Sequence, residues 1–320
     1  MMRYYTPLRY PGGKGKLADF IKLIIRGNGL LDRHYAEPYA GGAAVALSLL
    51  FDEYVSEIHI NDIDETLHAF WHSVLYETRD LCTLISKTPV TLKEWHCQKN
   101  VQENPKGHSK LEIGFSTFFL NRTNRSGIIT GGVIGGKKQE GKWKIGARYN
   151  KSQLIHRVQK IGKYKDRIHL YNLDAFMFIT SVLEHLDQRM LVYLDPPYLK
   201  KGRRLYRNNY QYNDHVKISD LIRARLKQNW VISYDYSSEI SALYHDYNQL
   251  IYQIPYSAGK RYRGSEVVIY SKTLTIPACI DPLEVNRKSR NSNELGKIQI
   301  QLPVPKVGGR CLDTKGRSRD

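Results

Sequence analysis

The sequence has few cysteines, and they lie far apart. Four occur among 320 residues, at Cys82, Cys97, Cys279 and Cys311, and no two form a C-x-x-C pair. This spacing argues against a disulfide framework. It also gives no zinc motif, because His96 beside Cys97 lacks the two further ligands that a structural zinc site needs. We therefore expect reduced thiols, as in cytoplasmic proteins, and no bound metal.

Long hydrophobic runs and internal repeats are also missing. The most apolar stretch, Ala43 to Phe51, contains Ser48 and is far shorter than the ~20 residues that cross a bilayer. The first ten residues have no apolar core of the kind that a secretory signal requires. No repeat with a period of roughly 20 to 50 residues is visible, which argues against solenoids and propellers. We expect a cytoplasmic protein without a membrane partner.

Acidic residues are scarce relative to basic ones. Lys and Arg number 49 against 31 Asp and Glu, which gives a formal net charge of +18. Such a surplus attracts phosphates and disfavours an enzyme that handles only small neutral metabolites. The length fits one large domain, or a core domain with an insertion. A globular protein with a polyanionic partner is the class that remains.

The first part of the chain has the pattern of a βαβ unit. His34 to Glu37 is a candidate strand, and a Gly-containing turn then leads into a small-residue helix from Ala43 to Phe51. Glu57 to Ile60 is a second strand, and Glu65 to Glu77 has helical periodicity. Strand, helix and strand in this order predict a parallel sheet and an α/β fold.

The same pattern resumes later in the chain. A near-continuous apolar run, Met190 to Leu194, is typical of a strand buried on both faces. A helix from Phe176 to Leu183 has Asp174 as its candidate cap. The other predicted strands are Arg167 to Tyr171, Trp230 to Ser233 and Glu266 to Tyr270, and the other helices are Ile218 to Lys227 and Ser237 to Tyr244.

Composition divides the chain into three parts. Residues 78–161 mix helical periodicity with a Gly-rich basic stretch, which we interpret as an inserted module. Residues 275–320 carry scattered Pro, Asn, Ser, Lys and Arg with little periodicity, which predicts a basic and poorly ordered tail. Residues 1–77 and 162–274 then form one core domain, interrupted by the insertion.

The most specific motif is the tetrapeptide Asp195-Pro196-Pro197-Tyr198, directly after the predicted buried strand. In open α/β sheets this position faces the ligand crevice. The two prolines fix the backbone and leave carbonyls free to accept hydrogen bonds. Asp195 adds an ionised acceptor and Tyr198 a flat ring. Two acceptors beside an aromatic ring suit the amino group of a nucleobase, although a rigid turn with a structural tyrosine would have the same residues.

A second motif lies between the first strand and its helix. Glu37-Pro38-Tyr39-Ala40-Gly41-Gly42 places small residues at a helix N-terminus, where a ligand can approach the backbone. Asp62 ends the next strand, 62 − 41 = 21 residues after Gly41. This is the spacing at which an acidic residue reaches ribose hydroxyls in nucleotide-binding βαβ units. A strict G-x-G-x-x-G is absent, which disfavours a dinucleotide-dependent dehydrogenase.

A third motif, Arg9-Tyr10-Pro11-Gly12-Gly13-Lys14, is not a Walker phosphate loop, because Leu17 follows Lys16 where Ser or Thr would be needed. Together, the three motifs resemble the Dam-like, α-class adenine-specific DNA methyltransferases, which use S-adenosylmethionine. The likeness extends from Tyr4 to about Lys272. It also includes Asn61-Asp62, Phe118 to Arg122 with Gly127, and Trp230 to Asp235. The sequence departs from the family at Ala43, where the family often has a second glycine. Alanine is small, so we expect the turn after the first strand to keep its conformation.

The resemblance implies a Rossmann-like S-adenosylmethionine-dependent methyltransferase fold with an inserted, mainly helical DNA-recognition domain. It also implies roles for single residues. Asp195 and the Pro196 carbonyl would bind the amino group of a flipped-out adenine in duplex DNA, Pro197 would hold the turn, and Tyr198 would stack on the base. Cofactor contacts would come from Tyr10, Lys14 near the carboxylate, Glu37, Gly41, Asp62 at the ribose, Asp174 near the adenine, and Asp195.

Two basic segments are candidate DNA contacts. We expect Asn121, Arg122, Asn124 and Arg125 in the insertion to read base edges, since Arg and Asn pair with guanine and adenine. The run after Tyr198 would clamp phosphates around the flipped base, through Lys200, Lys201, Arg203 and Arg204. A cognate restriction endonuclease is a possible partner but is not required.

The motifs leave rival functions open. A methyltransferase that acts on adenine in RNA, or on the exocyclic amine of cytosine in DNA, would need the same acceptors and cofactor. A nucleic-acid-binding protein that keeps the fold without catalysis would share the basic charge. The recognition sequence and the oligomeric state do not follow from one chain.

Overall fold

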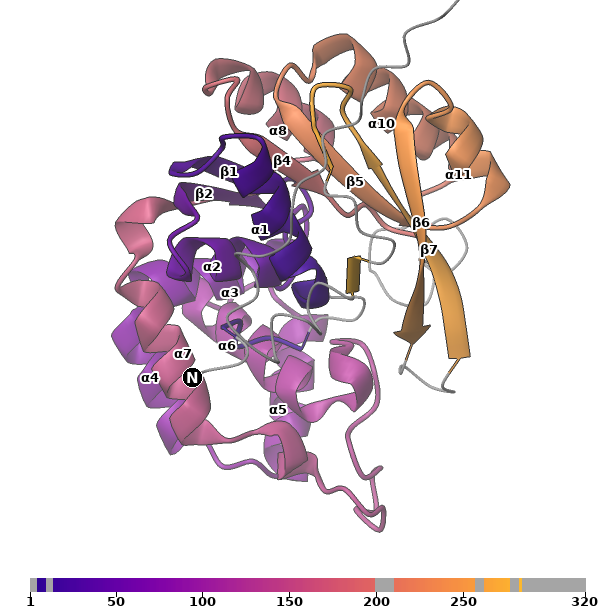
Figure 1. The fold of residues 1–320 in the computed structure, drawn as a ribbon. Helices are drawn as coiled ribbons and strands as arrows, with labels where there is room; N and C mark the ends of the chain where they lie inside the picture. Colours follow the sequence, from indigo (N-terminus) through magenta and orange to yellow (C-terminus); the bar gives the residue numbers. More distant parts are fainter. Residues whose placement is uncertain (1–4, 10–13, 199–209, 257–261, 277–281, 284–320) are drawn as a thin grey trace, which may run out of the picture.

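Seven strands form one mixed sheet in the order β3-β2-β1-β4-β5-β7-β6 (Figure 1). The computed structural model describes residues 5–9, 14–198, 210–256, 262–276 and 282–283. Strands β1 to β5 are parallel, and β7 is antiparallel to both β5 and β6. The strands are β1 (Arg33–Glu37), β2 (Val55–Asn61), β3 (Ile168–Tyr171), β4 (Leu191–Leu194), β5 (Asn229–Asp235), β6 (Asn248–Tyr256) and β7 (Tyr262–Tyr270).

The predicted βαβ unit is present. Strand β1 leads through the Gly41 turn into α2 (Ala44–Phe51), and β2 then pairs in parallel with β1. The switch in strand order lies between β1 and β4, so the two carboxyl ends separate there and open a crevice. The mixed α/β architecture agrees with the Rossmann-like prediction.

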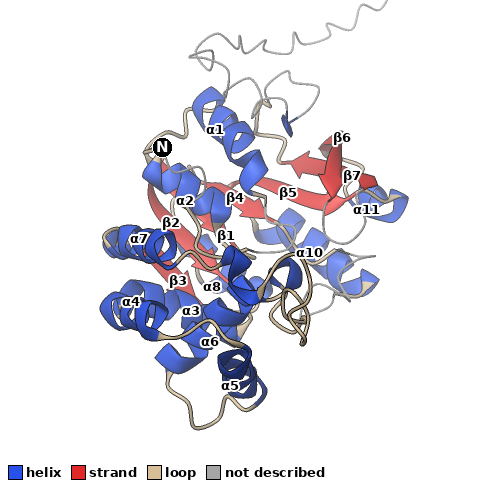
Figure 2. Cartoon of the chain, turned by 90° about the horizontal axis from the view of Figure 1, so that it is seen from below, coloured by secondary structure: helices blue, strands red, loops and turns tan. Residues whose placement is uncertain are grey.

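Helices cover both faces of the sheet (Figures 1 and 2). One apolar core joins the first face to α1 (Ala18–Gly27), α2 and α3 (Glu65–Tyr76). The other core joins the second face to α8 (Ala175–Ser181), α10 (Tyr212–Arg225) and α11 (Ser238–Leu243). The central strand β4 has four buried residues in succession, as its apolar run predicts.

The insertion is helical and packs directly on the sheet domain. Its helices α4 (Thr78–Lys87), α5 (Leu92–Glu103), α6 (Lys110–Thr123) and α7 (Lys151–Gly162) gather at the end of the molecule away from β6 and β7 (Figures 1 and 2). The rings of Phe70 in α3 and Phe118 in α6 stack at 6.0 Å. A Cβ on Gly114 would lie 2.6 Å from the Ala69 carbonyl oxygen, so α6 approaches α3 closely. The insertion therefore shares a core with the sheet domain.

Several elements differ from the sequence prediction. Helix α10 begins at Tyr212, six residues before the predicted Ile218, and ends at Arg225. The helix that begins after Asp174 ends at Ser181, not at Leu183, and a 3-10 turn follows it. Helix α1 and edge strand β6 were not predicted. The tail keeps a contact at its start, where the Thr275 backbone exchanges two 2.8 Å hydrogen bonds with the Asn28 side chain. Residues 277–281 and 284–320 of the predicted tail lie outside the described residues.

No helix in the described residues is long and apolar enough to span a bilayer.

Ala43 adopts a left-handed conformation, with φ 45° and ψ 37°. An L-residue with a side chain costs ~1–2 kcal/mol there, and glycine avoids this cost. We expect Ala43→Gly to raise the free energy of unfolding by ~1 kcal/mol. The matched control, Ala44→Gly in the first turn of α2, should instead lower the free energy of unfolding by ~0.5–1 kcal/mol. Urea unfolding of both variants measures this; a loss of stability in Ala43→Gly would contradict the strain.

Candidate active site

A cavity of ≈ 570 Å³ opens at the carboxyl ends of β1, β2 and β4. Three of its walls come from the motifs found in the sequence: the turn from Glu37 to Val45, Asp62 after β2, and Asp195 with Pro197 after β4. Leu173 to Ala175 before α8 and Tyr210 before α10 line it as well. The cavity therefore lies at the switch point of the strand order, where open α/β sheets bind ligands.

The turn after β1 is held by carboxylates. Asp62 accepts hydrogen bonds from the backbone N–H groups of Gly41 and Asp64, both at 3.0 Å. Glu37 accepts from the Tyr35 hydroxyl and from the Ala46 N–H at the start of α2, also at 3.0 Å. Gly41 itself has φ 49°, a conformation that favours glycine. These contacts fix the backbone that forms the cavity wall.

Burial changes the protonation of both carboxyl groups. It raises the pKa of Asp62 to about 6, and the two backbone hydrogen bonds lower this pKa in part. It raises the pKa of Glu37 to about 8, despite the hydrogen bonds from Tyr35 and Ala46. At neutral pH Asp62 is therefore mostly an anion, whereas Glu37 is mostly neutral.

Asp174 caps the next helix beside the same cavity. Its carboxylate accepts a 2.8 Å hydrogen bond from the Phe176 N–H, which confirms it as the N-cap of α8. The residue also lines the cavity. Asp62 and Asp174 thus provide two acceptors at one end of the cavity, well suited to hydroxyl and amino donors of a nucleoside.

Asp195 lies at the other end, directly after β4. Its Oδ1 accepts a 3.1 Å hydrogen bond from the Ser233 hydroxyl and lies 3.7 Å from the Lys14 Nζ. Its side chain is 17 % exposed, so one part of the carboxylate faces the cavity. Burial raises the pKa of Asp195 to about 6, and Lys14 opposes this effect. The carboxylate is therefore an oriented acceptor at neutral pH.

Lys14 is at the centre of a buried polar network. Its Nζ donates to the Tyr198 hydroxyl at 2.6 Å and to Glu266 Oε1 at 2.8 Å. Tyr252 donates to the other oxygen of Glu266 at 2.5 Å. Burial alone would lower the pKa of Lys14, but Asp195 and Glu266 raise it well above its usual range. Lys14 thus lies close to two carboxylates, at 3.7 Å from Asp195 and 2.8 Å from Glu266.

Glu266 was missed as a site residue. The sequence places it only at the start of an apolar strand, with no motif around it. It is 1 % exposed and pairs in register with Asp235 across β5 and β7. A charged residue beginning a run of Val and Ile was the available signal, because such a residue is buried only with a partner.

The sequence of this chain matches the model of a known protein family. A family model described as D12 class N6 adenine-specific DNA methyltransferase matches residues 10–260. The chain belongs to this family. No curated protein matches the sequence. The D12-class chain is therefore an adenine-specific DNA methyltransferase with DNA as its substrate, and the family implies S-adenosylmethionine as the methyl donor.

In this methyltransferase, Tyr198 lies differently from the prediction. Its ring is 2 % exposed, the Lys14 Nζ lies 5.0 Å from the ring centroid, and its hydroxyl donates to Glu266 at 2.9 Å. It does not line the cavity, whereas Tyr39 and Tyr210 do. Tyr198 therefore offers no open face to a base, because its ring is buried and its hydroxyl is hydrogen-bonded to Lys14 and Glu266. Pro197 lines the cavity beside Asp195, and Pro196 lies between Asp195 and Pro197 in the chain.

Two predicted base-reading residues of the D12-class chain are buried. Asn121 bonds to the backbone N–H and carbonyl of Arg9 and to the Gly127 carbonyl. Asn124 accepts from the Trp95 indole N–H at 2.6 Å and donates to the backbone carbonyls of residues 128 and 129. Both are at most 1 % exposed, so this structure argues against their role as base readers. They fix the insertion against the N-terminal segment instead.

Gly127 allows the insertion and the N-terminal segment at Arg9 to approach each other closely. It has φ 79°, and a Cβ there would lie 1.9 Å from the Arg9 carbonyl oxygen. Arg125, beside it, is exposed and remains a candidate DNA contact.

Four arginines near the cavity were not grouped by the sequence analysis. Arg9, Arg122, Arg148 and Arg157 all line it, although they come from three segments far apart in the chain. Arg122 donates hydrogen bonds to the backbone carbonyls of Arg148 and Pro7, and Arg157 donates to that of Thr6. Burial, Arg9 and Arg157 lower the pKa of Arg122 to about 9. Among the described residues, no carboxylate forms an ion pair with these four arginines, so the cavity wall gathers positive charge.

Five predicted contacts lie outside the described residues. They are Tyr10 at the cofactor and Lys200, Lys201, Arg203 and Arg204 at the DNA backbone. These assignments stay predictions.

Proposed function

We propose that this methyltransferase transfers a methyl group to the N6 amino group of an adenine turned out of duplex DNA, at a specific short sequence. The observation that carries the proposal is the position of Asp195, which points its carboxylate into the cavity and is oriented by Ser233 and Lys14. Because this carboxylate is recessed, a base that stays stacked in a duplex would not reach it.

The cavity fits S-adenosylmethionine by the chemistry of its donors and acceptors. Asp62 and Asp174 would accept from the ribose hydroxyls and the adenine amino group, beside the aromatic rings of Tyr39 and Tyr210. When bound, the cofactor supplies an electrophilic methyl group on a cationic sulfur. The Asp195 carboxylate, which lines the cavity, would favour this cation nearby. Lys14 would contact the carboxylate of the cofactor. Glu37 and Gly41 would shape the wall of the cavity that holds it.

Asp195 and the Pro196 carbonyl would accept both hydrogens of the target amino group. This pair of hydrogen bonds localises the nitrogen lone pair, which is otherwise delocalised into the ring. The attacking nitrogen gains positive charge in the transition state, and an oriented carboxylate stabilises that charge more than it stabilises the neutral amine. Tyr198 and Glu266 would act through Lys14 as positioning residues.

A test of flipping uses 2-aminopurine at the target adenine. We expect its fluorescence to rise on enzyme binding, because the base leaves the stack. The same probe at a neighbouring position is the control, and equal fluorescence at both positions would overturn this part of the proposal. Single-molecule sequencing of host DNA with and without the gene identifies the target sequence first. A cognate restriction endonuclease is compatible with this function and is not needed for it.

The arginines around the cavity are proposed phosphate contacts. We expect the exposed Arg148→Ala to weaken DNA binding and to reduce the slope of log K against log salt by about 1, because one phosphate contact is lost. Arg79→Ala, an exposed arginine on α4 that does not line the cavity, is the matched control. Fluorescence anisotropy at several salt concentrations measures both. Equal effects of the two substitutions would contradict the assignment.

The methylation rate should fall at acidic pH. Asp195 has a pKa of about 6, raised from 3.8 chiefly by burial, and its ionised form is the stronger acceptor for its hydrogen of the target amino group. Below pH 6 the carboxyl group is protonated, so we expect kcat to fall about tenfold per pH unit. Asp62 has a similar pKa, but protonation of Asp62 would raise the KM for the cofactor and leave kcat unchanged. Single-turnover rates at saturating cofactor separate the two; a flat profile from pH 5 to 8 would contradict the role of Asp195.

A further inference from the structure

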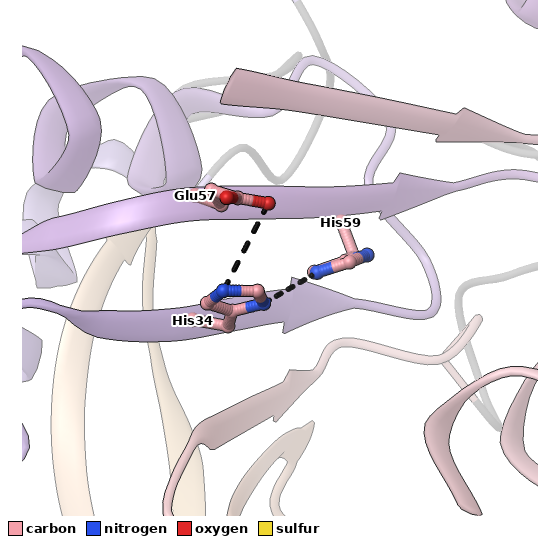
Figure 3. A group of neighbouring side chains, drawn as sticks. All are labelled: His34, Glu57 and His59. Atoms are coloured by element: carbon pink, nitrogen blue, oxygen red, sulfur yellow. Dashed lines mark hydrogen bonds and ion pairs between the residues drawn. The ribbon is translucent and has the colours of Figure 1, made fainter. Parts of the chain in front are cut away.

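A cluster of imidazoles and one carboxylate lies on the sheet outside the active-site cavity. His34 comes from β1, and Glu57 and His59 come from β2 (Figure 3). His169 comes from the neighbouring strand β3. His59 pairs in register with both Ala36 and His169, so these side chains share one face of three adjacent strands. None of them lines the active-site cavity.

The potential ligand atoms of three residues converge. One ligand atom each from His34, Glu57 and His59 lies within 4.8 Å of the others. A His34 nitrogen lies 3.0 Å from His59 Nε2, and the other lies 3.8 Å from Glu57 Oε2. Ligand atoms around a tetrahedral zinc ion are ~3.3–3.5 Å apart, given bonds of ~2.0–2.1 Å. The two distances involve different His34 nitrogens, of which an ion would take one, and the three ligand atoms together lie within 4.8 Å of one another, so side-chain adjustments of about 1 Å would bring them to this spacing.

Two neighbours orient these ligands. Tyr171 lies 3.1 Å from His59 Nδ1, which leaves Nε2 directed at His34. His169 Nε2 lies 2.5 Å from Glu57 Oε2 and fixes the carboxylate. Outer hydrogen bonds of this kind are typical of metal-ligating histidines and carboxylates. His59 is 2 % exposed, so the protein interior holds its ring in place.

We propose that His34, Glu57 and His59 form a binding site for one divalent transition-metal ion of the zinc class, with solvent completing the coordination. Imidazole and carboxylate ligands suit such ions, whereas magnesium prefers oxygen ligands alone. The ion would join β1 to β2 and, through the contact between Glu57 and His169, edge strand β3. The side chains of His34 and Glu57 are 34 % and 35 % exposed, so an ion can enter from solvent.

The test is calorimetric titration of untagged full-length protein with Zn²⁺ after chelator treatment. We expect one ion per chain, affinity at least tenfold lower in His34→Ala and in Glu57→Gln, and unchanged affinity in His156→Ala, an exposed histidine of α7. Zinc at a hundredfold excess over Kd should raise Tm by about 4 °C. Mg²⁺ should give neither effect.

Co²⁺ provides a second readout, because its visible absorption reports coordination by protein ligands. A Co²⁺ band that is lost in His34→Ala but kept in His156→Ala supports the site. Absence of saturable zinc binding, or equal affinity in all variants, would overturn the proposal. Neither readout depends on methylation, so the result is independent of the proposed function.

Discussion

Replacing Asp195 with Ala lowers the single-turnover methylation rate by at least ~10²–10³-fold, because one oriented acceptor at developing charge is worth that much. Cofactor affinity changes far less, since Asp62 and Asp174 lie at the other end of the cavity. The matched control is Asp187→Ala, a half-exposed carboxylate paired with Arg33 outside the cavity, which keeps the wild-type rate. Rates from radiolabelled methyl transfer, with cofactor affinity from calorimetry, measure the two effects separately.

Asp195→Asn distinguishes catalysis from folding. The folded-state pKa of Asp195 is about 6 against an ordinary 3.8, so its ionised form destabilises the fold progressively as pH rises from 3.8 to 6. At pH 7 the neutral amide should therefore leave Tm unchanged or higher while the rate still falls. An inactive variant with normal Tm supports a catalytic carboxylate. A variant that keeps the wild-type methylation rate would contradict this role of Asp195.

Lys14→Met lowers the free energy of unfolding by ~3–5 kcal/mol, the cost of removing one partner from a buried ion pair. The substitution leaves Asp195 and Glu266 facing each other without their shared cation. Lys16→Met, an exposed lysine two residues away, should change stability by less than ~0.5 kcal/mol. Urea unfolding measures both variants.

The partner of Lys14 is tested by a double-mutant cycle. In the Glu266→Gln background, Lys14→Met should cost at least ~1 kcal/mol less, because fewer carboxylates are left uncompensated. Strict additivity of the two substitutions would show that Lys14 and Glu266 do not interact. A small effect of Lys14→Met alone would contradict the buried network.

The sequence predicts the elements that carry strong local patterns. The apolar run at β4, the Gly turn after β1 and the N-cap Asp174 each follow from neighbouring residues, and each is present. The carboxyl ends of parallel strands meet at one edge, so the convergence of Asp62 and Asp195 on one cavity was also predictable.

Contacts between distant segments were not predictable in the same way. Glu266 meets Lys14 across 252 positions, and no local pattern encodes that pairing. Asn121 and Asn124 looked like base readers because their residue type permits it. Only the structure shows that the Asn121 amide bonds to Arg9 and Gly127, and that the Asn124 amide bonds to Trp95 and to the carbonyls of residues 128 and 129. The burial of Tyr198 was not predictable either: its hydroxyl accepts a hydrogen bond from Lys14, which is distant in the sequence.

Clusters built from several strands are equally hidden from sequence patterns. His34, His59 and His169 have no ligand-like spacing, yet adjacent strands bring them to one face. The arginines that line the cavity come together through the packing of α6, the 3-10 turn η3 (Ile145–Arg148) and α7 of the insertion against the N-terminal segment. Strand order, register and helix packing determine such groupings, and none of them follows from one segment alone.

The central claim is that Asp195 directs methylation to adenine N6 in duplex DNA. The direct measurement incubates the protein with methyl-labelled S-adenosylmethionine and either duplex DNA or RNA, followed by digestion to nucleosides and chromatography. We expect label in N6-methyl-2′-deoxyadenosine with the wild type, and a loss of at least ~10²-fold with Asp195→Ala. Label in RNA alone, label on cytosine, or an unchanged yield from Asp195→Ala would contradict the account.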